Sequence, residues 1–415
     1  MSSYMLKISE ISNDQSYSLS EKARLLNNHL TALENDEMIF FNRISLNGSS
    51  YSRLVFDRYS NKKEMIYLAS NDYLNLTQHP RVISSAINAI KQYGTGAGSA
   101  PLFGGAIDKH VELEQKIAKL KGCEAALIYT SGFGTNYGTI SALLHEKDVA
   151  ILDMYVHASI IDGCKNTNTK FFKHNDIDSL EKVLRNAKDK YNTKLIIVDG
   201  VFSMDGDIAR LDKIVELAKL YSAYVMVDEA HATGIIGENG RGTPEYFNIE
   251  GKVDIVAGTF SKALGGVGGF VAATNDIIKF LKFNSRSYIF STALPPSIAC
   301  SAIESINIIE TEPIHRKKLW QNIEYFRSNL LKMGFNIGNS QTAIFPIIIG
   351  DEYKVMSMNR ELNKENIFVN AAFYPAVPRR LSRIRMSLMS TNTTDQLDRV
   401  LDILETLGKK YGVIG

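Results

Sequence analysis

The sequence predicts an α/β protein whose large domain holds a mostly parallel sheet of seven strands. Short runs of β-branched and aliphatic residues alternate with helix-length segments, and the runs are apolar on both faces, as strands buried on both sides are. They cover residues 66–70, 126–129, 149–153, 195–200, 224–231, 253–262 and 268–274. A smaller α+β domain is expected at the C-terminus.

Amphipathic segments precede and separate these strands. The first begins near Ser20, and Ser18-x-x-Glu21 forms a capping box before it. Its apolar residues at helical spacing are Leu26, Leu30 and Leu33. A later helix is expected over 106–121, with Gly122 as its stop. The residues expected to face inward on that helix are Val111, Leu113, Ile117 and Leu120.

The C-terminal part of the sequence has a different order of helices and strands from the large domain. A long helical region over 297–334 leads into three apolar runs, and a last helix follows over about 393–410. In the third run, Arg383, Arg385 and Ser387 alternate with apolar residues, which predicts a strand with one buried and one polar face. We therefore expect three parts, an N-terminal segment 1–65, a large domain 66–296 and a small domain 297–415.

Composition excludes several classes of protein. The 415 residues contain 47 Lys and Arg against 45 Asp and Glu, a net charge of +2, which does not suit a general nucleic-acid binder. No signal peptide and no membrane span are expected. The three cysteines, Cys123, Cys164 and Cys300, are far apart and form no CxxC pair. Reduced thiols and a cytoplasmic protein are therefore expected.

Polar residues follow two of the predicted strands where open α/β sheets bind ligands. Asp228 and His231 follow one strand, and Thr259, Ser261 and Lys262 end the next. Desolvation lowers the pKa of a lysine in such a place, which suits Schiff-base chemistry with pyridoxal phosphate. Asp228 would keep the pyridine nitrogen of that cofactor protonated. The alternative is an ordinary Asp–Lys ion pair.

Other strand ends carry matching groups. The segment 129–136, YTSGFGTN, lies between a strand and a helix, so the amides of Gly132 and Phe133 can hold a phosphate. Thr259 and Ser261 offer hydroxyls to the same phosphate. His157 can stack on an aromatic ring, although a structural histidine is the alternative. Ser203 can donate a hydrogen bond to a ring oxygen.

The sequence argues against a dinucleotide-binding loop and against a metal site. Residues 94–98 form GxGxG, but a helical segment precedes them and Ser99 stands where a dinucleotide-binding loop has its last glycine. The histidines show no HExxH or similar spacing, so no metal site is expected. Solvated or core roles are expected for His29, His79, His110, His145, His174 and His315.

Four segments resemble the motifs of the α-oxoamine synthases, pyridoxal-phosphate enzymes that condense an amino acid with an acyl-CoA. They are GVFSMDGDIARL, VMVDEAHATG, GENGRG and GTFSKALGG, and the similarity runs from about residue 70 to the C-terminus. The resemblance implies an aspartate-aminotransferase-like fold, pyridoxal 5'-phosphate as cofactor and a homodimer with shared active sites. It also implies that glycine, serine or alanine is condensed with an acyl-CoA or another acyl thioester, such as an acyl carrier protein thioester.

The resemblance also implies roles for individual residues. Lys262 would form the Schiff base and move protons, Asp228 would pair with the ring nitrogen, and His157 would stack on the ring. His231 and Ser203 would reach the ring hydroxyl.

The remaining implied roles concern the substrate and a second subunit. Asn71 and Arg385 would bind the substrate carboxylate, with Arg383 as the alternative to Arg385. Ser291 and Thr292 would reach the phosphate bound to the partner subunit.

Substrate choice is the least defined feature. The motifs favour a glycine C-acetyltransferase-like or serine palmitoyltransferase-like enzyme, with 8-amino-7-oxononanoate synthase as the alternative within the family. Phe373 stands where oxononanoate synthases and some palmitoyltransferases often have Arg, which counts against both of those groups. Pro101 replaces an Arg that is usual in the acetyl- and palmitoyltransferases, and Asn392 replaces a His that is usual in the family. The loss of the cation at position 101 raises the hypothesis of a carrier-bound acyl donor. An aminotransferase or lyase on the same fold is a second alternative. Retention of Lys262 argues against a third, a non-enzymatic partner subunit.

Overall fold

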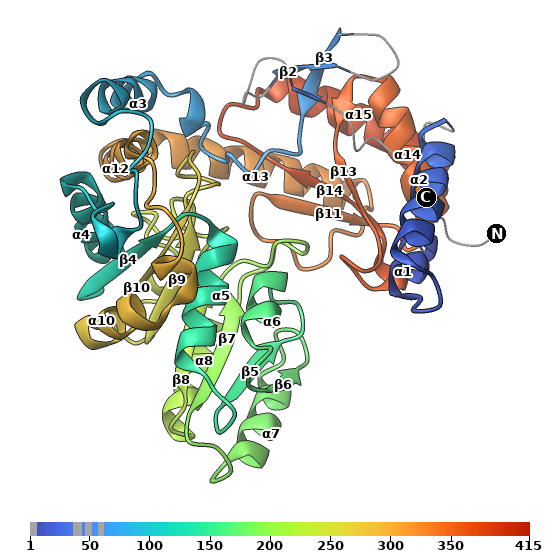
Figure 1. The fold of residues 1–415 in the computed structure, drawn as a ribbon. Coiled ribbons are helices and arrows are strands. Elements are labelled where there is room, and N and C mark those ends of the chain that lie inside the picture. The colour runs from blue at the N-terminus through green and yellow to red at the C-terminus, as the bar shows by residue number, and fades with distance from the viewer. Residues whose placement is uncertain (1–5, 36–43, 46–51, 57–61) are drawn as a thin grey trace. The chain divides into compact units, whose positions relative to one another are not determined.

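The computed structural model describes residues 6–35, 44–45, 52–56 and 62–415 (Figure 1). By packing, the chain separates into two units. The large unit comprises residues 71–203 and 207–318, and the small unit comprises residues up to 70, 204–206 and 319–415. The domain boundaries expected from the sequence stay predictions, and part of the expected N-terminal segment lies outside the described residues.

The large unit contains a seven-stranded sheet in the order β4-β10-β9-β8-β7-β5-β6. Its strands are β4 (Ala125–Tyr129), β5 (Val149–Asp153), β6 (Asn168–Phe172), β7 (Lys194–Asp199), β8 (Tyr224–Asp228), β9 (Ile255–Thr259) and β10 (Gly269–Ala273). Only β10 runs antiparallel to its neighbours, β4 and β9. The predicted mostly parallel seven-stranded sheet is therefore confirmed.

Both faces of this sheet are covered by helices, which explains why its strands lack a polar face. In β5, Ile151 packs into one hydrophobic core and its neighbour Leu152 into the other, because successive side chains of a strand point to opposite faces. The first core includes Leu180 of α7 (Ile177–Ala187) and Ile214 of α8 (Leu211–Leu220). The second includes Ile140 of α5 (Gly132–Leu143).

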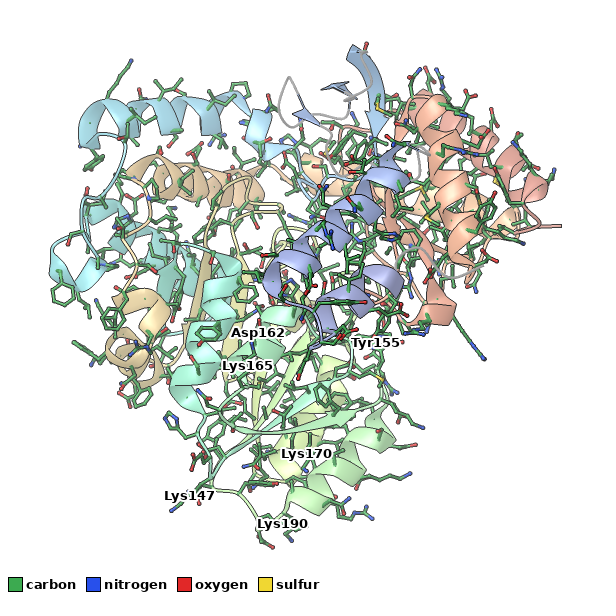
Figure 2. All side chains as sticks on the ribbon, turned by 45° about the vertical axis from the view of Figure 1, so that its right-hand side comes forward. Lys147, Tyr155, Asp162, Lys165, Lys170 and Lys190 are labelled. Atoms are coloured by element: carbon green, nitrogen blue, oxygen red, sulfur yellow. The ribbon has the colours of Figure 1, made fainter. Side chains whose placement is uncertain are left out.

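One strand was placed wrongly from the sequence. Residues 66–70 do not belong to the seven-stranded sheet, because β3 (Lys62–Tyr67) pairs in the small unit with β2 (Ser52–Phe56) and β12 (Ile367–Phe368). The seventh strand is instead β6, an edge strand whose polar residues hide its signal. Its Lys170 is exposed, together with nearby lysines such as Lys165 (Figure 2). Charged side chains on an edge strand discourage pairing with other chains.

Two expected helices are present. The first is α2 (Leu19–Asn35), whose capping box forms as Ser18 N–H donates to Glu21 and Glu21 N–H donates to Ser18 Oγ. The second is α4 (Asp108–Lys121), which ends at Gly122 with a φ of +64°, a left-handed conformation that glycine adopts without strain. Leu113, Ile117 and Leu120 are buried. The expectation for Val111 is wrong, because its side chain is 49% exposed.

Other helices complete the large unit. They are α3 (Pro80–Tyr93), α6 (Ala158–Gly163), α9 (Thr243–Tyr246), α10 (Asn275–Asn284), α11 (Arg286–Ile289) and α12 (Pro296–Thr311), with short 3-10 turns at Leu76–Gln78 and Pro101–Phe103. Among the described residues, no helix combines the length and apolarity needed to cross a bilayer.

The small unit contains α13 (Ile314–Lys332) for most of its length, α14 (Glu352–Lys364), α15 (Thr394–Lys410) and the earlier α1 (Leu6–Asn13) and α2. One sheet has the order β1-β2-β3-β12, with β1 at Ile44–Ser45. The other has the order β11-β14-β13, with β11 at Ile344–Ile348, β13 at Asn370–Ala372 and β14 at Arg383–Ser387.

The expectation of a polar face on β14 is wrong, because all five of its residues are buried. Arg383 is fully buried, and its guanidinium donates to Asp205 Oδ1 at 2.7 Å and to the carbonyls of Met204 and Leu381 at 2.9 Å. These bonds compensate for the loss of water around the charge. An alternating polar pattern therefore marks buried ion pairing here and not a solvated face.

Candidate active site

A cleft of about 180 Å³ opens at the ends of the central strands of the large unit. It is lined by nine of the residues singled out from the sequence, namely Gly132, Phe133, His157, Ser203, Asp228, His231, Thr259, Ser261 and Lys262. Because β5, β7, β8 and β9 run parallel, their carboxyl ends lie at one edge of the sheet. The sheet topology therefore gathers residues that are up to 130 positions apart (262 − 132).

The N-terminus of α5 forms one end of the cleft. Ser131 is its N-cap and accepts a hydrogen bond from Gly134 N–H at 2.9 Å, and Gly132 and Phe133 begin the helix. N–H groups of a first helical turn have no acceptor within the helix, so they suit an anion. Gly132 is required by a close approach, because a Cβ there would lie 2.9 Å from Thr259 Oγ1.

Thr259 and Ser261 form the facing side of this anion site. Thr259 Oγ1 donates to the carbonyl of Gly268 at 2.7 Å. Its only proton is then used, so in the 2.9 Å contact between the two hydroxyls Ser261 is the donor. Thr259 thus positions Ser261, and Ser261 is the more exposed of the two.

Asp228 ends β8 and is 6% exposed. Its carboxylate accepts a hydrogen bond from Ala230 N–H at 2.9 Å and one from Asn136 Nδ2 at 2.7 Å. Both donors are neutral amides, so they orient the carboxylate of Asp228 without themselves bringing a compensating charge. Asn136 was not recognised in the sequence. Its position in the first turns of the phosphate-facing helix, one turn after Gly132, was the available signal.

A buried hydrogen-bond chain joins Asp228 to His157. Asn136 Nδ2 also donates to Ser159 Oγ at 2.9 Å, and Ser159 Oγ lies 2.7 Å from Nδ1 of His157. Because that Nδ1 also accepts from Ser159 N–H, the Ser159 hydroxyl donates to it, and the ring proton is left on Nε2. Burial lowers the pKa of His157, against the opposing effect of Asp228, and keeps its ring neutral.

A hydrogen bond with a buried tyrosine fixes the position of His231. The Tyr73 hydroxyl lies 2.7 Å from Nδ1 of His231, and it donates to Asn71 Oδ1 at 3.5 Å. Tyr73 is 1% exposed and His231 is 7% exposed. The tyrosine therefore connects Asn71, one of the two residues expected to bind a carboxylate, with His231, which lines the cleft. Tyr73 was also missed in the sequence.

Asp199 lies at the floor of the cleft and ends β7. Complete burial, together with the nearby Asp228, raises its pKa well above the usual value for aspartic acid. Its carboxyl accepts the backbone N–H of His157 at 3.3 Å. The raised pKa favours the protonated, neutral form of Asp199.

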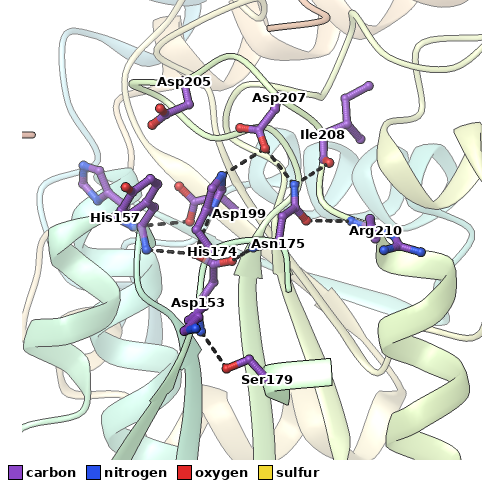
Figure 3. Close-up of polar contacts among 12 residues, drawn as sticks. Asp153, His157, His174, Asn175, Ser179, Asp199, Asp205, Asp207, Ile208 and Arg210 are labelled. Atoms are coloured by element: carbon purple, nitrogen blue, oxygen red, sulfur yellow. Dashed lines mark hydrogen bonds and ion pairs between the residues drawn. The ribbon is translucent and has the colours of Figure 1, made fainter. Parts of the chain in front are cut away.

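A cluster beside the cleft anchors the segment that carries Ser203. His174 lies between two buried aspartates, 3.0 Å from Asp153 Oδ1 through Nδ1 and 3.0 Å from Asp207 Oδ2 through Nε2 (Figure 3). Burial opposes charging of the ring, but the two carboxylates outweigh it and raise the pKa of His174 to about 10. The expected solvated or core role of His174 therefore takes the form of a partly buried imidazolium that fixes Asp207. Asn175 donates to the same carboxylate at 2.7 Å.

Four of the expected site residues do not line this cleft, and one of them, Asn71, accepts a hydrogen bond from the Tyr73 hydroxyl. Ser291 and Thr292 line a separate depression of about 50 Å³ in the large unit, together with Pro101. Glu114 also lines it, and burial raises the pKa of this carboxyl to about 7. Arg385 belongs to the small unit, where it donates to Ser387 Oγ at 2.9 Å.

The cleft fits pyridoxal phosphate on its own chemistry. A helix N-terminus and a serine hydroxyl suit the phosphate, a buried carboxylate suits a protonated ring nitrogen, and the lysine that follows β9 suits a carbonyl. The close approach of Thr259 at Gly132 excludes a side chain from this position.

Comparison with known proteins gives the same result. A family model described as aminotransferase class I and II matches residues 63–404. The 8-amino-7-oxononanoate synthase of Thermoanaerobacter pseudethanolicus is 46% identical over 354 residues, which are 85% of this chain and 90% of that protein. The 8-amino-7-oxononanoate synthase 1 of Bacillus subtilis is 44% identical over 356 residues, 85% of this chain and 91% of that protein.

Solved structures are similar as well. A serine palmitoyltransferase from S. paucimobilis with a bound PLP–myriocin aldimine superposes with a TM-score of 0.91 at 32% identity, covering 96% of this chain and 100% of that one. An 8-amino-7-oxononanoate synthase from Francisella tularensis superposes with a TM-score of 0.74 at 30% identity, covering 84% of this chain and 99% of that one.

Proposed function

The chain belongs to the aminotransferase class I and II family and, within it, to the α-oxoamine synthases, and on this premise we propose that it is an 8-amino-7-oxononanoate synthase. As a member of this family it is a pyridoxal-phosphate-dependent acyltransferase. The choice within the family rests on one observation, the 42–46% identity to several proteins of that name over most of both chains.

The name of that product defines the substrates. In 8-amino-7-oxononanoate the ketone at C7 and the six carbons beyond it come from a seven-carbon dicarboxylic acyl group. The aminated C8 and the C9 methyl group come from alanine without its carboxyl group. One C–C bond forms between the acyl carbon and the alanine α carbon, the thioester bond breaks, and CO₂ and a thiol leave.

The relatives thus favour the alternative that the sequence motifs placed second. The motifs favoured a glycine C-acetyltransferase-like or serine palmitoyltransferase-like enzyme. Phe373 counted against an oxononanoate synthase and against some palmitoyltransferases. Segments shared by all members of a family report the common reaction, whereas identity over the whole chain also includes the residues around the acyl group.

Each part of the cleft has a task in this reaction. Bound pyridoxal phosphate supplies an electron sink that makes the α proton of alanine acidic. With pyridoxal phosphate bound, Asp228, oriented by Asn136, would hold a proton on the ring nitrogen, and the N-terminus of α5 with Ser261 would hold the phosphate. His157 would contribute a neutral ring to the cofactor site, and Lys262 Nζ would be the attachment point of the cofactor and the base for the α proton.

We propose that Asn71 and Arg385 bind the carboxylate of the amino acid. A guanidinium forms two parallel hydrogen bonds to a carboxylate, which fixes its orientation. Arg383 does not suit this task, because its guanidinium is already paired with Asp205 and two backbone carbonyls. We further propose a cytoplasmic homodimer in which Ser291 and Thr292 contact the phosphate held by the partner subunit.

Turnover with a panel of substrates tests the proposal. Alanine, glycine and serine are each combined with seven-carbon dicarboxylic, acetyl and palmitoyl thioesters of CoA, and with the dicarboxylic thioester of an acyl carrier protein. We expect alanine and the dicarboxylic group to give the highest kcat/KM, with release of CO₂ and 8-amino-7-oxononanoate detected by mass spectrometry. Preference for glycine with acetyl-CoA, for serine with palmitoyl-CoA, or formation of a keto acid would contradict it.

The carrier is decided by the same panel. Pro101 stands where the acetyl- and palmitoyltransferases of the family usually have Arg, so this chain lacks that cation on the side where the acyl substrate is expected. We expect the acyl carrier protein thioester to be turned over at least as well as the CoA thioester. A strong preference for the CoA thioester would remove this part of the proposal and leave the main reaction intact.

A further inference from the structure

Two histidines and a glutamate from three helix ends converge on the large unit, outside the cleft. His79 is the N-cap of α3, Glu312 is the C-cap of α12, and His315 lies in the first turn of α13. One potential ligand atom from each lies within 4.8 Å of the other two. Their side chains are 17%, 32% and 27% exposed, so an ion from solvent can reach them.

The geometry suits a small tetrahedral cation. Glu312 Oε2 lies 3.5 Å from Nε2 of His315 and 3.9 Å from Nε2 of His79. Zinc bonds of about 2.0–2.1 Å place ligand atoms roughly 3.4 Å apart, so small rotations of these partly exposed side chains are sufficient. Glu312 and His315 lie on either side of the short turn between α12 and α13, and this turn brings the carboxylate and the imidazole together.

The charges around the cluster favour a cation. Arg81 forms an ion pair with Glu304 at 2.6 Å and another with Oε1 of Glu312, which leaves Oε2 directed at the two imidazoles. Carboxylates that bind metals are commonly held by a second partner in this way. Two carboxylates and one guanidinium sum to a charge of −1 before any cation enters.

One existing contact would change. Nδ1 of His79 accepts the N–H of Arg81 at 3.3 Å, a long cap bond. Coordination through Nε2 places the ring proton on Nδ1, so the cap bond is replaced by a metal bond. The two rings stand edge to face, 5.6 Å between centroids and 79° between planes.

We propose that His79, Glu312 and His315 form a zinc site with water as the fourth ligand. A bound ion would join the first turn of α3 to the turn between α12 and α13. The absence of a metal-binding spacing along the sequence is explained, because His79 is 233 residues from Glu312 (312 − 79) and only folding brings it there. The site does not depend on the proposed catalytic function, since none of the three residues lines the cleft.

Titration of the tag-free, cofactor-loaded enzyme with zinc chloride tests the site. We expect isothermal titration calorimetry to show one zinc ion per chain at this site, and zinc to raise the melting temperature, because a ligand that binds only the folded state stabilises it. His315→Gln is the cleanest variant, since the only polar contact described for that side chain is with Glu312. It should weaken zinc binding at least tenfold and abolish the thermal shift, and His79→Gln should do the same.

His145→Gln is the matched control, because His145 is exposed and lies on a different loop. It should bind zinc as the wild type does. Circular dichroism and melting temperature without zinc establish that each variant is folded. Equal zinc affinity in wild type and His315→Gln, or no binding by the wild type, would overturn the proposal.

Discussion

At the scale of single residues, the cleft is defined by how its functional groups are held. Asp228 and His157 were recognised from the sequence, but the groups that orient them, Asn136 and Ser159, were not. One buried amide serves both, because Asn136 donates to Asp228 at 2.7 Å and to Ser159 at 2.9 Å. Such a network stabilises the site only when every member has its partner, because a buried carboxylate without hydrogen-bond donors raises the free energy of the folded protein.

Lys262 is expected to be indispensable. Lys262→Ala should lose the absorbance of the Schiff base and reduce condensation by about 10²–10⁴-fold or more, since it removes both the attachment point and the group that moves the α proton. Absorption spectra and thioester turnover measure the two effects. Lys219→Ala, an exposed lysine on α8, is the control. Wild-type absorbance or turnover in Lys262→Ala would remove the central assignment.

Asn136 is expected to act as a positioning residue. Asn136→Ala should lower kcat by about 10–100-fold, the cost of one hydrogen bond to a charged group, and change KM for alanine little. Asp228→Asn should cost more, on the order of 10²–10³-fold, because the charge itself is lost. Asn284→Ala changes an exposed asparagine and serves as control. If Asn136→Ala changed stability alone, with kcat unaltered, the role would be structural.

At the scale of elements, strand ends and their anchors decide where the functional groups lie. β5 ends at Asp153 and the segment after β7 contains Asp207, and both carboxylates bind His174. Tyr155 stacks on the ring of His174 at 4.3 Å, and Phe202 meets it edge-on at 4.4 Å. The charged ring thus holds together two segments that follow different strands.

This cluster predicts a pH dependence of stability. The pKa of His174 is raised from 6.5 to about 10 in the folded protein, so its contribution is fully present below pH 6.5 and is lost as the pH rises through about 10. His174→Gln should lower stability at neutral pH by about 2–3 kcal/mol, since two aspartates lose a cation that is only partly buried.

Calorimetric melting of wild type and His174→Gln across this range measures the effect. The difference between the two proteins should be largest below pH 6.5 and should shrink towards pH 10. His145→Gln should behave as the wild type at every pH. A difference that stays constant with pH would show that the ring of His174 is not charged.

At the scale of the whole molecule, the proposed dimer predicts shared active sites. The cleft contains Lys262, whereas Ser291 and Thr292 line a different depression of the large unit. If they complete the partner's phosphate site, defects in the two places should complement each other. Lys262→Ala and a Ser291→Ala/Thr292→Ala double variant should each have low activity as homodimers.

Co-expressed with different tags and purified as a heterodimer, the two variants should regain activity above either parent. One of the two clefts then has a wild-type lysine from one subunit and wild-type hydroxyls from the other. Light scattering confirms the mass of the dimer. Activity of the heterodimer no higher than the mean of the two parents would argue against sites shared in this way.

The pattern of apolar runs was sufficient to predict the mostly parallel sheet, since strands buried on both faces must be apolar throughout. Motifs at strand ends were sufficient to predict nine of the cleft residues, because parallel strands end at a common edge. Apolar runs and strand-end motifs did not predict edge strand β6, the exposure of Val111 or the burial of Arg383. Each depends on what packs against the residue and not on its own chemistry.

The sequence by itself thus determined the fold class and the cofactor chemistry, and it predicted residues that line the cleft, because local periodicity and strand-end motifs encode them directly. Tertiary structure alone decided which groups are neighbours across long distances, such as Asn136 with Asp228, His174 with two aspartates, and His79 with Glu312 and His315. The physical reason is that hydrogen bonds, charge pairing and metal coordination act over a few ångströms. Only the folded chain brings such residues within that range.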